Sequence, residues 1–377
     1  MKKQGRAIYV HIPFCVRKCR YCDFLSFPWD SAKAEVYVAD LLKEIGQADW
    51  SRVDCIESIF IGGGTPSLLP ASVIGEILNA IRAQAPLLWD CEISMEANPG
   101  TVDLSQLRAL RKLGINRISL GAQCFQPETL KKLGRIHDDK AIEKTARDVV
   151  AAGFSNWNLD LMFDLPGQGM EDVEESIRRA IALSPTHLSY YSLIVEPGTP
   201  FYEEWEEGRL PMATEEGNRA LYHHGRRLME AAGYHQYEIS NFAKRGKACR
   251  QNLAYWRRRP YLGFGLGAAS MEGNSRYVNP RDLQIYHNRI SEGTTVRELE
   301  ETMDLREALS EAIILGLRLT HGISMAELIR KFGPEVDSIR PLIIEQQRLG
   351  LLIPGDQRIA LTEAGMDLAN QVMINFL

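Results

Sequence analysis

Short apolar runs alternate with longer amphipathic segments through the first half of the chain. The short runs are rich in branched and aromatic side chains and predict strands over residues 7–12, 56–61, 91–97, 117–123, 157–163 and 187–193. The longer segments have apolar positions at helical spacing and predict helices over residues 31–48, 70–84, 103–113, 139–152 and 170–183. Near-continuous apolar strands that alternate with helices are typical of a parallel sheet covered by helices.

Six such strand–helix units predict an α/β fold of the TIM-like type, a partial (β/α)6 barrel. A doubly wound sheet is the alternative. Polar or Gly-rich sequences directly follow three of the strands: GGGTP after residue 61, EANPG after residue 95 and GAQCF after residue 120. Because the carboxyl ends of the strands carry the site in parallel barrels, this arrangement favours the barrel.

The pattern changes after about residue 205. A helix is expected over residues 214–232, followed by a Gly- and aromatic-rich stretch. Further helices are expected over residues 304–319, 324–332 and 335–348, then a two-stranded wing around the turn at 354–356 and a final helix over 362–376. We therefore expect a barrel in residues 1–205, a barrel-completing and connecting segment in 206–300, and a C-terminal winged-helix-like α+β domain in 301–377.

The net charge of the chain argues against some classes of binding partner. There are 44 Lys and Arg residues against 49 Asp and Glu residues, a net charge of −5. General nucleic-acid binders and proteins that bind anionic membranes have a basic excess, so we expect no nucleic acid partner and a packing or partner-contact role for the winged-helix-like domain. The first residues predict neither a signal peptide nor a transmembrane segment, so we expect a cytoplasmic protein.

Three of the seven cysteines, Cys15, Cys19 and Cys22, form a Cys-x3-Cys-x2-Cys cluster directly after the first strand. Three thiolates at this spacing can hold three corners of a [4Fe–4S] cluster and leave one iron without a protein ligand. The alternative is a zinc site with His11 or Asp23 as a fourth ligand, although no second Cys or His pair follows at zinc-site spacing.

The segment YVHIPFCVRKCRYCDF resembles the cluster loop of the radical S-adenosylmethionine (SAM) superfamily, in its anaerobic coproporphyrinogen III oxidase-like family. The resemblance runs almost end to end, since GLRLTHG at 316–322 is similar to that family's C-terminal domain. It implies that SAM chelates the open iron and is reductively cleaved to a 5′-deoxyadenosyl radical. It does not identify the electron donor or whether this chain turns over SAM, so no catalytic residue is assigned.

The resemblance also implies contacts to SAM. The residues matched to them are Tyr9, Tyr21, Gly63, Gly64, Thr65, Glu96, Gln123, Arg135 and Asp160. Each has an ordinary alternative, such as a turn glycine, a solvated carboxylate or a core tyrosine. A carboxylate buried in a barrel mouth needs a cationic or hydrogen-bonding partner, which Arg135 or the ammonium of SAM can supply.

Two branches share this framework. The dehydrogenases, which oxidatively decarboxylate coproporphyrinogen III, resemble Cys-x3-Cys-x2-Cys-x-Cys, but here the last position is Phe24. The chain is therefore more similar to the HemW branch, whose members bind heme and pass it to recipient proteins. The dehydrogenase activity is the first alternative, and a non-catalytic zinc or partner-binding protein is the second.

The HemW branch has a His-Asn-x-x-Tyr-Trp motif whose histidine is associated with heme. This chain has Gln251, Asn252, Tyr255 and Trp256 there, and a glutamine amide is a poor ligand for heme iron. Other iron ligands to consider are Cys249, His223, His224, His235 and His321. The basic run at 257–259 suits heme carboxylates, a membrane surface or a solvated loop. Two further departures from the family are Cys124 in place of serine and Asp164 in place of glycine.

Overall fold

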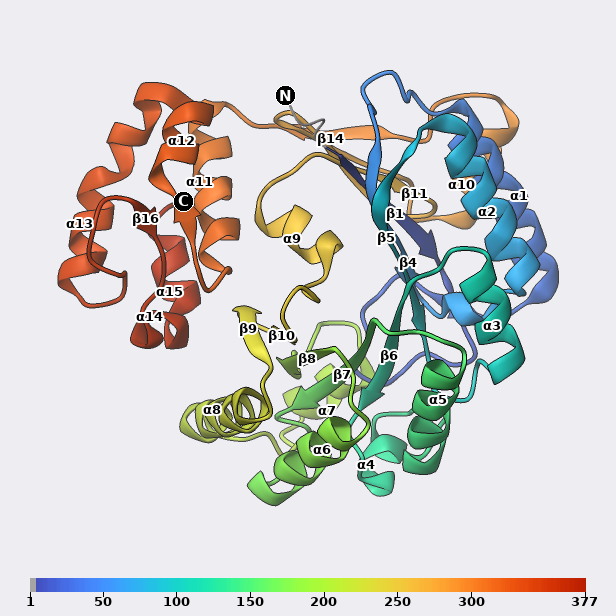
Figure 1. The fold of residues 1–377 in the computed structure, drawn as a ribbon, viewed down its shortest axis with the longest axis horizontal. Coiled ribbons are helices and arrows are strands. Elements are labelled where there is room, and N and C mark those ends of the chain that lie inside the picture. The colour runs from blue at the N-terminus through green and yellow to red at the C-terminus, as the bar shows by residue number, and fades with distance from the viewer. Residues whose placement is uncertain (1–4) are drawn as a thin grey trace.

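The structure is a computed structural model, in which residues 5–377 are described. Within these residues, six adjacent parallel strands form the middle of a curved twelve-stranded sheet (Figure 1). In order across the sheet they are β1 (Arg6–Ile12), β4 (Ile56–Gly63), β5 (Leu87–Ala97), β6 (Arg117–Gln123), β7 (Trp157–Phe163) and β8 (His187–Ser192). Each covers a predicted strand within a few residues, and the partial (β/α)6 barrel is confirmed.

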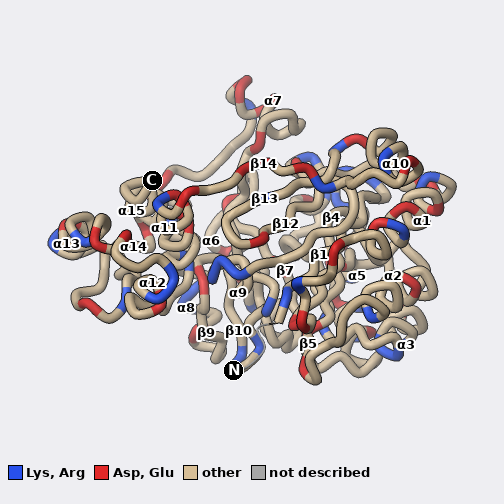
Figure 2. Tube along the Cα trace, turned by 90° about the horizontal axis from the view of Figure 1, so that it is seen from above, with Lys and Arg blue, Asp and Glu red and all other residues tan. Residues whose placement is uncertain are grey.

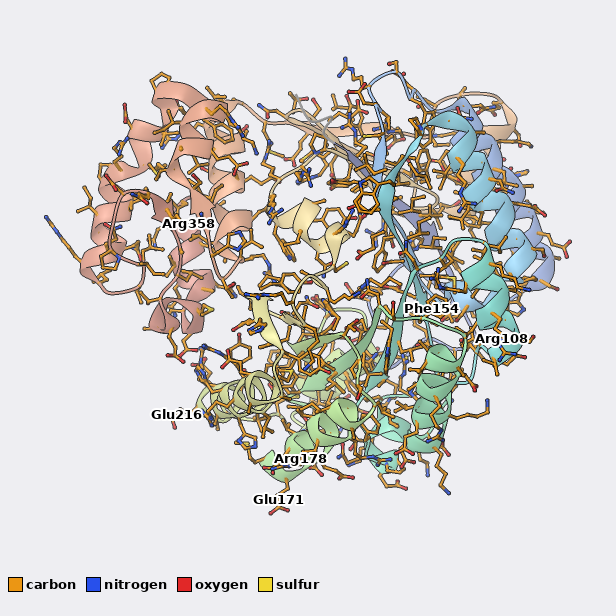
Figure 3. All side chains as sticks on the ribbon, in the orientation of Figure 1. Arg108, Phe154, Glu171, Arg178, Glu216 and Arg358 are labelled. Carbon is orange, nitrogen blue, oxygen red and sulfur yellow. The ribbon has the colours of Figure 1, made fainter. Side chains whose placement is uncertain are left out.

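Helices cover the outer, convex face of the sheet (Figure 1). They are α1 (Ser31–Gln47), α2 (Ala71–Gln84), α3 (Leu104–Lys112), α5 (Asp139–Ala151), α6 (Met170–Ala182) and α8 (Glu215–Ala231). Aspartates fix the starts of three of them, because Asp30, Asp103 and Asp138 each accept a hydrogen bond from the backbone N–H three residues on. Charged side chains such as Arg108 and Glu171 point outward from these helices (Figure 3), so the helices bury their apolar faces on the sheet.

The sheet has more strands than predicted, because residues beyond 230 add strands to both of its edges. Next to β1 lie β11 (Tyr261–Phe264), β12 (Ala269–Glu272), β13 (Ser275–Val278) and β14 (Glu298–Thr302), and next to β8 lie β10 (Asn241–Ala243) and β9 (His235–Glu238). β11 is parallel to β1, whereas the other five are paired antiparallel. The remaining elements of this region are β2 (Phe14–Cys15), β3 (Phe27–Pro28), the 3-10 turn η1 (Pro66–Leu68), α4 (Pro127–Lys132), α7 (Pro200–Glu206), α9 (Arg250–Trp256) and α10 (Leu283–Ser291).

The C-terminal residues form a separate unit with its own hydrophobic core. Its elements are α11 (Leu305–Leu317), β15 (Ile323–Ser324), α12 (Met325–Phe332), the 3-10 helix η2 (Gly333–Ile339), α13 (Arg340–Arg348), β16 (Arg358–Ile359), α14 (Glu363–Asp367) and α15 (Ala369–Ile374). Three expectations were wrong in detail. The wing strands meet only through a bridge between Leu352 and Leu361, because β16 pairs with β15 instead. The predicted helix over 335–348 begins as a 3-10 turn, and the final helix is broken at Leu368.

The C-terminal unit contacts the barrel beside α9 and β9 (Figure 1). Arg258, just after α9, pairs with Glu311 of α11 at 2.5 Å, and the backbone of Tyr237 in β9 accepts from Thr320 at 3.1 Å. α7 lies at the edge of the molecule (Figure 2) and is joined to the cysteine loop, since Phe201 N–H donates to Arg20 O at 3.1 Å. No helix in residues 5–377 is long and apolar enough to cross a membrane.

Candidate functional site

The three clustered cysteines line one side of a cavity of about 520 Å³ at the carboxyl ends of the parallel strands. All three are free and half-buried. Side chains from other loops donate to two of the sulfurs: Thr65 Oγ1 to Cys15 Sγ and Arg135 Nη1 to Cys19 Sγ, both at 3.5 Å. Hydrogen-bond donors aimed at sulfur would stabilise the negative charge of a metal-bound thiolate.

The cysteine loop is held by backbone contacts at both of its ends. Phe27 N–H donates to Pro13 O and Trp29 N–H to Cys15 O, both at 2.7 Å, which makes β2 and β3 a parallel pair. The return of the chain beside its own start places all three cysteines on one short loop. Backbone hydrogen bonds between β2 and β3, and not a disulfide, therefore hold the loop that carries the three thiols.

The Gly-rich turn after β4 packs directly against this loop. Gly63 has φ +109°, and a Cβ there would lie 2.4 Å from the ring of His11. A Cβ on Gly64 would lie 2.6 Å from Phe14 O. Only glycine permits this approach, which lets Gly64 N–H bond Ile12 O and brings the hydroxyl of Thr65 to Cys15. Gly63 and Gly64 line the cavity, whereas Thr65 is buried behind it.

Two half-buried carboxyls face the cavity from neighbouring regions of the sheet. Glu96 at the end of β5 accepts from Gly63 N–H at 3.0 Å, and Asp160 in β7 accepts from Asn158 Nδ2 at 2.7 Å. Burial, together with the negative charge of Asp160, raises the pKa of Glu96 to about 8. Burial also raises the pKa of Asp160. A cationic ligand in this cavity would relieve both costs.

Arg135 lies in the same cavity but has different partners from those expected. Its guanidinium donates to Gly121 O at 2.6 Å, to Asn98 Oδ1 and to Cys19. It makes no bond to Glu96, because Asn98, which also donates to Thr65 at 2.9 Å, accepts from the arginine instead. Of the two cationic partners expected for a carboxylate here, the ammonium of SAM remains for Glu96. Arg135 Nε is buried without a protein partner and is free for a ligand.

Of the remaining predicted SAM contacts, Tyr21 and Gln123 line this cavity and Tyr9 does not. Gln123 accepts from the hydroxyl of Tyr191 at 3.1 Å. Tyr191 and Asn98 are cavity residues that the sequence analysis missed. Asn98 stands two residues after Glu96 in the EANPG segment, which was the available signal for it.

A second cavity of about 510 Å³ adjoins the first. Phe24, Gly63 and Glu96 line both. The other lining residues are mostly aromatic or small: Tyr9, His11, Tyr255, Trp256, Tyr261, Gly267, Ala268, Ala269, Met271, Arg276 and Leu315. The cavity thus lies between the β1–β13 edge of the sheet, α9 and α11 of the C-terminal unit, and it suits a flat apolar ligand.

The glutamine and asparagine of the motif on α9 lie outside both cavities. Gln251 is buried, accepts from Ser58 Oγ at 2.8 Å and donates to Tyr255 OH at 2.9 Å. Asn252 donates to Tyr237 OH at 3.4 Å. Of the motif residues, only Tyr255 and Trp256 line the second cavity. The indole Nε1 of Trp256 is buried and has no protein partner.

The other proposed iron ligands also lie elsewhere. Cys249 is buried outside both cavities, His223 contacts Asp367 at 2.9 Å, and His224 contacts Glu174 at 3.0 Å. His235 is exposed on β9, and His321 lies at a separate cavity in the C-terminal unit. Two arginines of the basic run form ion pairs, Arg258 with Glu311 and Arg259 with Glu57.

The zinc alternative finds no ready donor in His11. Its Nε2 lies 2.9 Å from Leu25 O and must carry the proton, so Nδ1 accepts from Tyr9 OH at 2.9 Å. Burial lowers the pKa of His11, in keeping with a neutral ring. In the part of the chain that the structure describes, no three His, Cys, Asp or Glu side chains are gathered around a point that could hold a single ion.

Comparison with known proteins decides the family. The model of the radical SAM superfamily matches residues 9–180, and that of the HemN C-terminal domain matches residues 303–368. The heme chaperone HemW of Bacillus subtilis is 37% identical over 99% of this chain and 99% of its own length. The chain belongs to the HemW family of radical SAM proteins. HemW of Escherichia coli is also 37% identical, over 98% of both chains.

Structural comparison agrees with this assignment of the fold. The radical SAM enzyme coproporphyrinogen III oxidase (HemN) from Escherichia coli superposes with a TM-score of 0.85 at 22% identity, covering 99% of this chain and 90% of that one. At that identity the likeness supports the fold alone. Membership in the radical SAM superfamily implies a [4Fe–4S] cluster and SAM as cofactors.

Proposed function

We propose that this protein is a heme chaperone of the radical SAM type. In this proposal the first cavity holds a [4Fe–4S] cluster and SAM, and the second cavity holds heme for transfer to a recipient protein. The observation that carries the proposal is the shared wall: Phe24, Gly63 and Glu96 separate a cavity lined by three thiols from one lined by aromatic side chains. We choose heme as the ligand of the second cavity because the HemW relatives are named heme chaperones.

The residues of the first cavity fit a cubane cluster. Cys15, Cys19 and Cys22 offer three thiolates from one loop, and His11, one of the two alternative zinc ligands, is already engaged on both nitrogens. Three ligands leave one iron for a chelating ligand, and the cluster would supply one-electron chemistry. We assign Arg135 to stabilising the negative charge of the Cys19 thiolate through its bond at 3.5 Å.

The same cavity has groups that suit SAM, a cation with an amino acid end and a nucleoside end. Glu96 and Asp160 are half-buried carboxyls with raised pKa values, and a nearby positive charge would stabilise their ionised forms. Arg135 Nε is a buried donor without a protein partner and suits a carboxylate, and Gly63 and Gly64 line the cavity beside the cysteines. Tyr21 and Gln123 remain for the nucleoside. Tyr9 and Thr65 do not line this cavity. Tyr9 hydrogen-bonds His11, and Thr65 hydrogen-bonds the sulfur of Cys15.

The second cavity has the character of a porphyrin site. Tyr255, Trp256 and Tyr261 present aromatic surface, and the stretch 267–269 is small and flat. Trp256 Nε1 is a buried donor without a protein partner, as a heme carboxylate requires. Gln251 has no part in ligation here and positions Tyr255 instead.

Cluster assembly tests the first half of the proposal. Reconstituted protein should contain about four irons and four sulfides per chain, as the cluster stoichiometry requires. Cys19→Ala should abolish assembly, whereas Cys55→Ala, which removes a buried free thiol outside the cavity, should leave it intact. Stoichiometric zinc in place of iron, or equal iron in both variants, would refute the assignment.

Heme titration tests the second half. Trp256→Leu should weaken heme binding at least about tenfold, equivalent to about 1.4 kcal/mol. Trp205→Leu, an exposed tryptophan on α7, is the matched control and should have no effect. Anaerobic incubation with SAM, a reductant and coproporphyrinogen III should yield no protoporphyrinogen IX. Formation of that product would support the dehydrogenase alternative instead.

We also propose that the protein is located in the cytoplasm, where its seven free cysteines stay reduced.

A further inference from the structure

The wall of the second cavity has a single strongly basic residue. Among the described residues that line this cavity, Arg276 is the only lysine or arginine. The basic run at 257–259, which the sequence suggested for heme carboxylates, does not line the cavity, and two of its arginines are held in ion pairs. A carboxylate on a ligand in this cavity therefore has one permanent cation to meet, and that cation lies on the sheet.

Arg276 belongs to a row of cross-strand neighbours at the edge of the sheet. Tyr261 of β11 is paired with Met271 of β12, and Met271 is paired with Arg276 of β13. Residues that stand directly opposite each other on neighbouring strands point to the same side of a sheet. All three line the second cavity, as that rule requires. The row thus presents an aromatic ring, a flexible thioether and a guanidinium to the same ligand.

Arg276 is held where the sheet meets the C-terminal unit. Its Nη1 donates to Glu301 Oε1 of β14 at 2.8 Å, and its Nη2 donates to Glu311 of α11. These two bonds fix the plane of the guanidinium at the side of the cavity that α11 closes. A guanidinium has more N–H donors than these two bonds use, so donors remain for a ligand.

The two glutamates that pair with Arg276 do not depend on it. Glu311 also accepts from Arg258 Nε at 2.5 Å, and the side chain of Arg258 is 8% exposed. Glu301 is 46% exposed, so water can solvate its carboxylate. Breaking a buried ion pair is costly when it leaves a charge unpaired, and neither glutamate would be left so. Arg276 can therefore turn to a ligand carboxylate at little cost.

The position of Arg276 also orients the ligand. Arg276 contacts α11 through Glu311, whereas Glu96 lies in the wall that the two cavities share. A carboxylate at the shared wall would face the carboxyl of Glu96, and a carboxylate beside α11 meets a cation. A flat ligand with carboxylates on one edge is thus expected to bind with that edge toward the C-terminal unit and its opposite edge toward the first cavity.

We propose that Arg276 is the carboxylate-binding residue of the second cavity, and that this cavity selects a porphyrin whose edge carries free carboxylates. The aromatic walls bind the flat ring whether or not its carboxylates are free. Arg276 adds the discrimination between the free acid and a neutral ester of similar shape. This inference rests on the proposed function, since it deepens the assignment of heme to this cavity.

The experiment compares two ligands that differ in charge: heme, and heme dimethyl ester, whose carboxylates are both methylated. Each is titrated into the full chain at the same detergent concentration, and the Soret absorbance gives its Kd. We call the Kd of the ester divided by the Kd of heme the ester ratio. The test variants are Arg276→Gln, which removes the cation, and Arg276→Lys, which keeps it. The matched control is Arg258→Gln, which removes the other arginine on Glu311 and lies outside the cavity.

The wild-type ester ratio should be at least about 10, because a hydrogen bond between charged groups contributes enough for a tenfold preference. Arg276→Gln should lose the preference for heme, Arg276→Lys should keep part of it, and Arg258→Gln should keep all of it. A substitution that only loosens the C-terminal unit weakens both ligands alike. It leaves the ester ratio unchanged, so a purely structural role of Arg276 does not produce the expected result.

Equal ester ratios in wild type and Arg276→Gln would overturn the carboxylate site, while saturable heme binding would leave the proposed function standing. An equal fall in Arg258→Gln would assign the discrimination to the ion cluster as a whole and not to Arg276. A ratio as low in Arg276→Lys as in Arg276→Gln would show that Arg276 does not act through its charge. If heme gives no saturable Soret change with wild type, the proposed function fails and the carboxylate site fails with it.

Discussion

Gln251 donates a hydrogen bond of 2.9 Å to the hydroxyl of Tyr255, one turn further along α9. The glutamine is 2% exposed, and its carbonyl oxygen is occupied by the hydroxyl of Ser58 on β4. Tyr255, not Gln251, reaches the second cavity. The residue that replaces the motif histidine thus fixes the orientation of a cavity-lining aromatic side chain and lies behind it.

This geometry predicts that Gln251→His will not create a heme ligand. The imidazole would stand behind Tyr255, held between Ser58 and the tyrosine hydroxyl, without access to the cavity. Heme titration should therefore give the same Soret maximum for Gln251→His as for wild type. A new low-spin spectrum in the variant would contradict this, and would mean that α9 turns when heme binds.

A second prediction concerns Glu96, whose pKa burial raises to about 8. A carboxyl with a raised pKa in the folded state binds its proton more tightly there than in the unfolded chain. Its contribution to stability is complete below about pH 4 and is lost as the pH rises toward 8. Glu96→Gln should therefore stabilise the protein without cofactors at pH 8.5, by on the order of 2 kcal/mol, and change little at pH 5.

Thermal unfolding of the protein without cofactors at the two pH values measures this difference. The control is Glu171→Gln on the outer end of α6, where the side chain points into solvent (Figure 3). That substitution should shift the melting temperature equally at both pH values. The argument about Glu96 fails if its variant gains no stability at pH 8.5 relative to pH 5.

A third prediction follows from Asp164, which has φ +58°. Its carboxylate accepts from Ala213 N–H at 3.0 Å and from Asn218 Nδ2 at 2.6 Å, so hydrogen bonds hold a left-handed backbone where the family has glycine. Asp164→Ala loses the bonds and keeps the strain, and should cost about 2–3 kcal/mol. Asp164→Gly loses the same bonds but relieves the strain, and should cost about 1 kcal/mol less. Urea unfolding compares the two, and equal losses would exclude backbone strain at this position.

The sequence was sufficient for the parallel strands but not for the edge strands, and glycine explains the difference. β7 was predicted at its observed bounds because apolar residues alternate with Asn158 and Asp160 and continue to Phe163 with no glycine among them. Around β11 the pattern is interrupted by Gly263 and Gly265. A Cβ on Gly263 would lie 2.1 Å from Ala269 O, and one on Gly265 would lie 2.3 Å from Tyr37 OH. Close packing therefore removes the side chains from which strand periodicity is recognised.

For the site, the residue types were predictable but several partners were not. Arg135 was one of two groups expected to supply a partner for a carboxylate such as Glu96, because a buried charge needs an opposite charge or a hydrogen bond. The bond from Arg135 to Asn98 depends on how β5 and β6 end beside each other, which spacing does not reveal. The second cavity was hidden for a similar reason, since its walls come from β1, α9 and α11, three elements far apart in the sequence.

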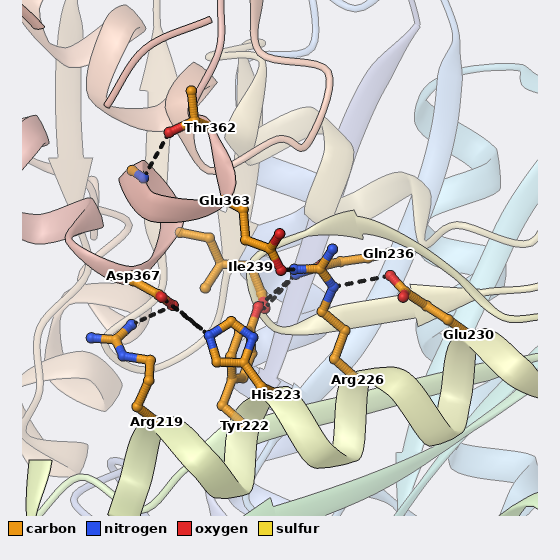
Figure 4. Close-up of polar contacts among 11 residues, drawn as sticks. Arg219, Tyr222, His223, Arg226, Glu230, Gln236, Ile239, Thr362, Glu363 and Asp367 are labelled. Atoms are coloured by element: carbon orange, nitrogen blue, oxygen red, sulfur yellow. Dashed lines mark hydrogen bonds and ion pairs between the residues drawn. The ribbon is translucent and has the colours of Figure 1, made fainter. Parts of the chain in front are cut away.

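The last prediction concerns the contact between α8 and the C-terminal unit (Figure 4). Asp367 in α14 accepts from Arg219 at 2.8 Å and from His223 at 2.9 Å, and its side chain is 27% exposed. The two units have separate hydrophobic cores, and Leu315 of the C-terminal unit helps to close the second cavity. Asp367→Asn should therefore weaken the docking of that unit by about 0.5–1 kcal/mol, and should accelerate heme exchange and proteolysis in residues 292–304.

The neighbouring ion pair supplies the matched control. Glu363 contacts Arg226 at 3.3 Å, but its side chain is 70% exposed (Figure 4). A pair so exposed contributes little, because water and salt screen it. Glu363→Gln should thus leave both the proteolysis rate and the heme off-rate unchanged. If the two substitutions have the same effect, the pairs on Asp367 do not hold the C-terminal unit over the cavity. If only Asp367→Asn accelerates both rates, a local ion pair controls access to the aromatic cavity from a distance.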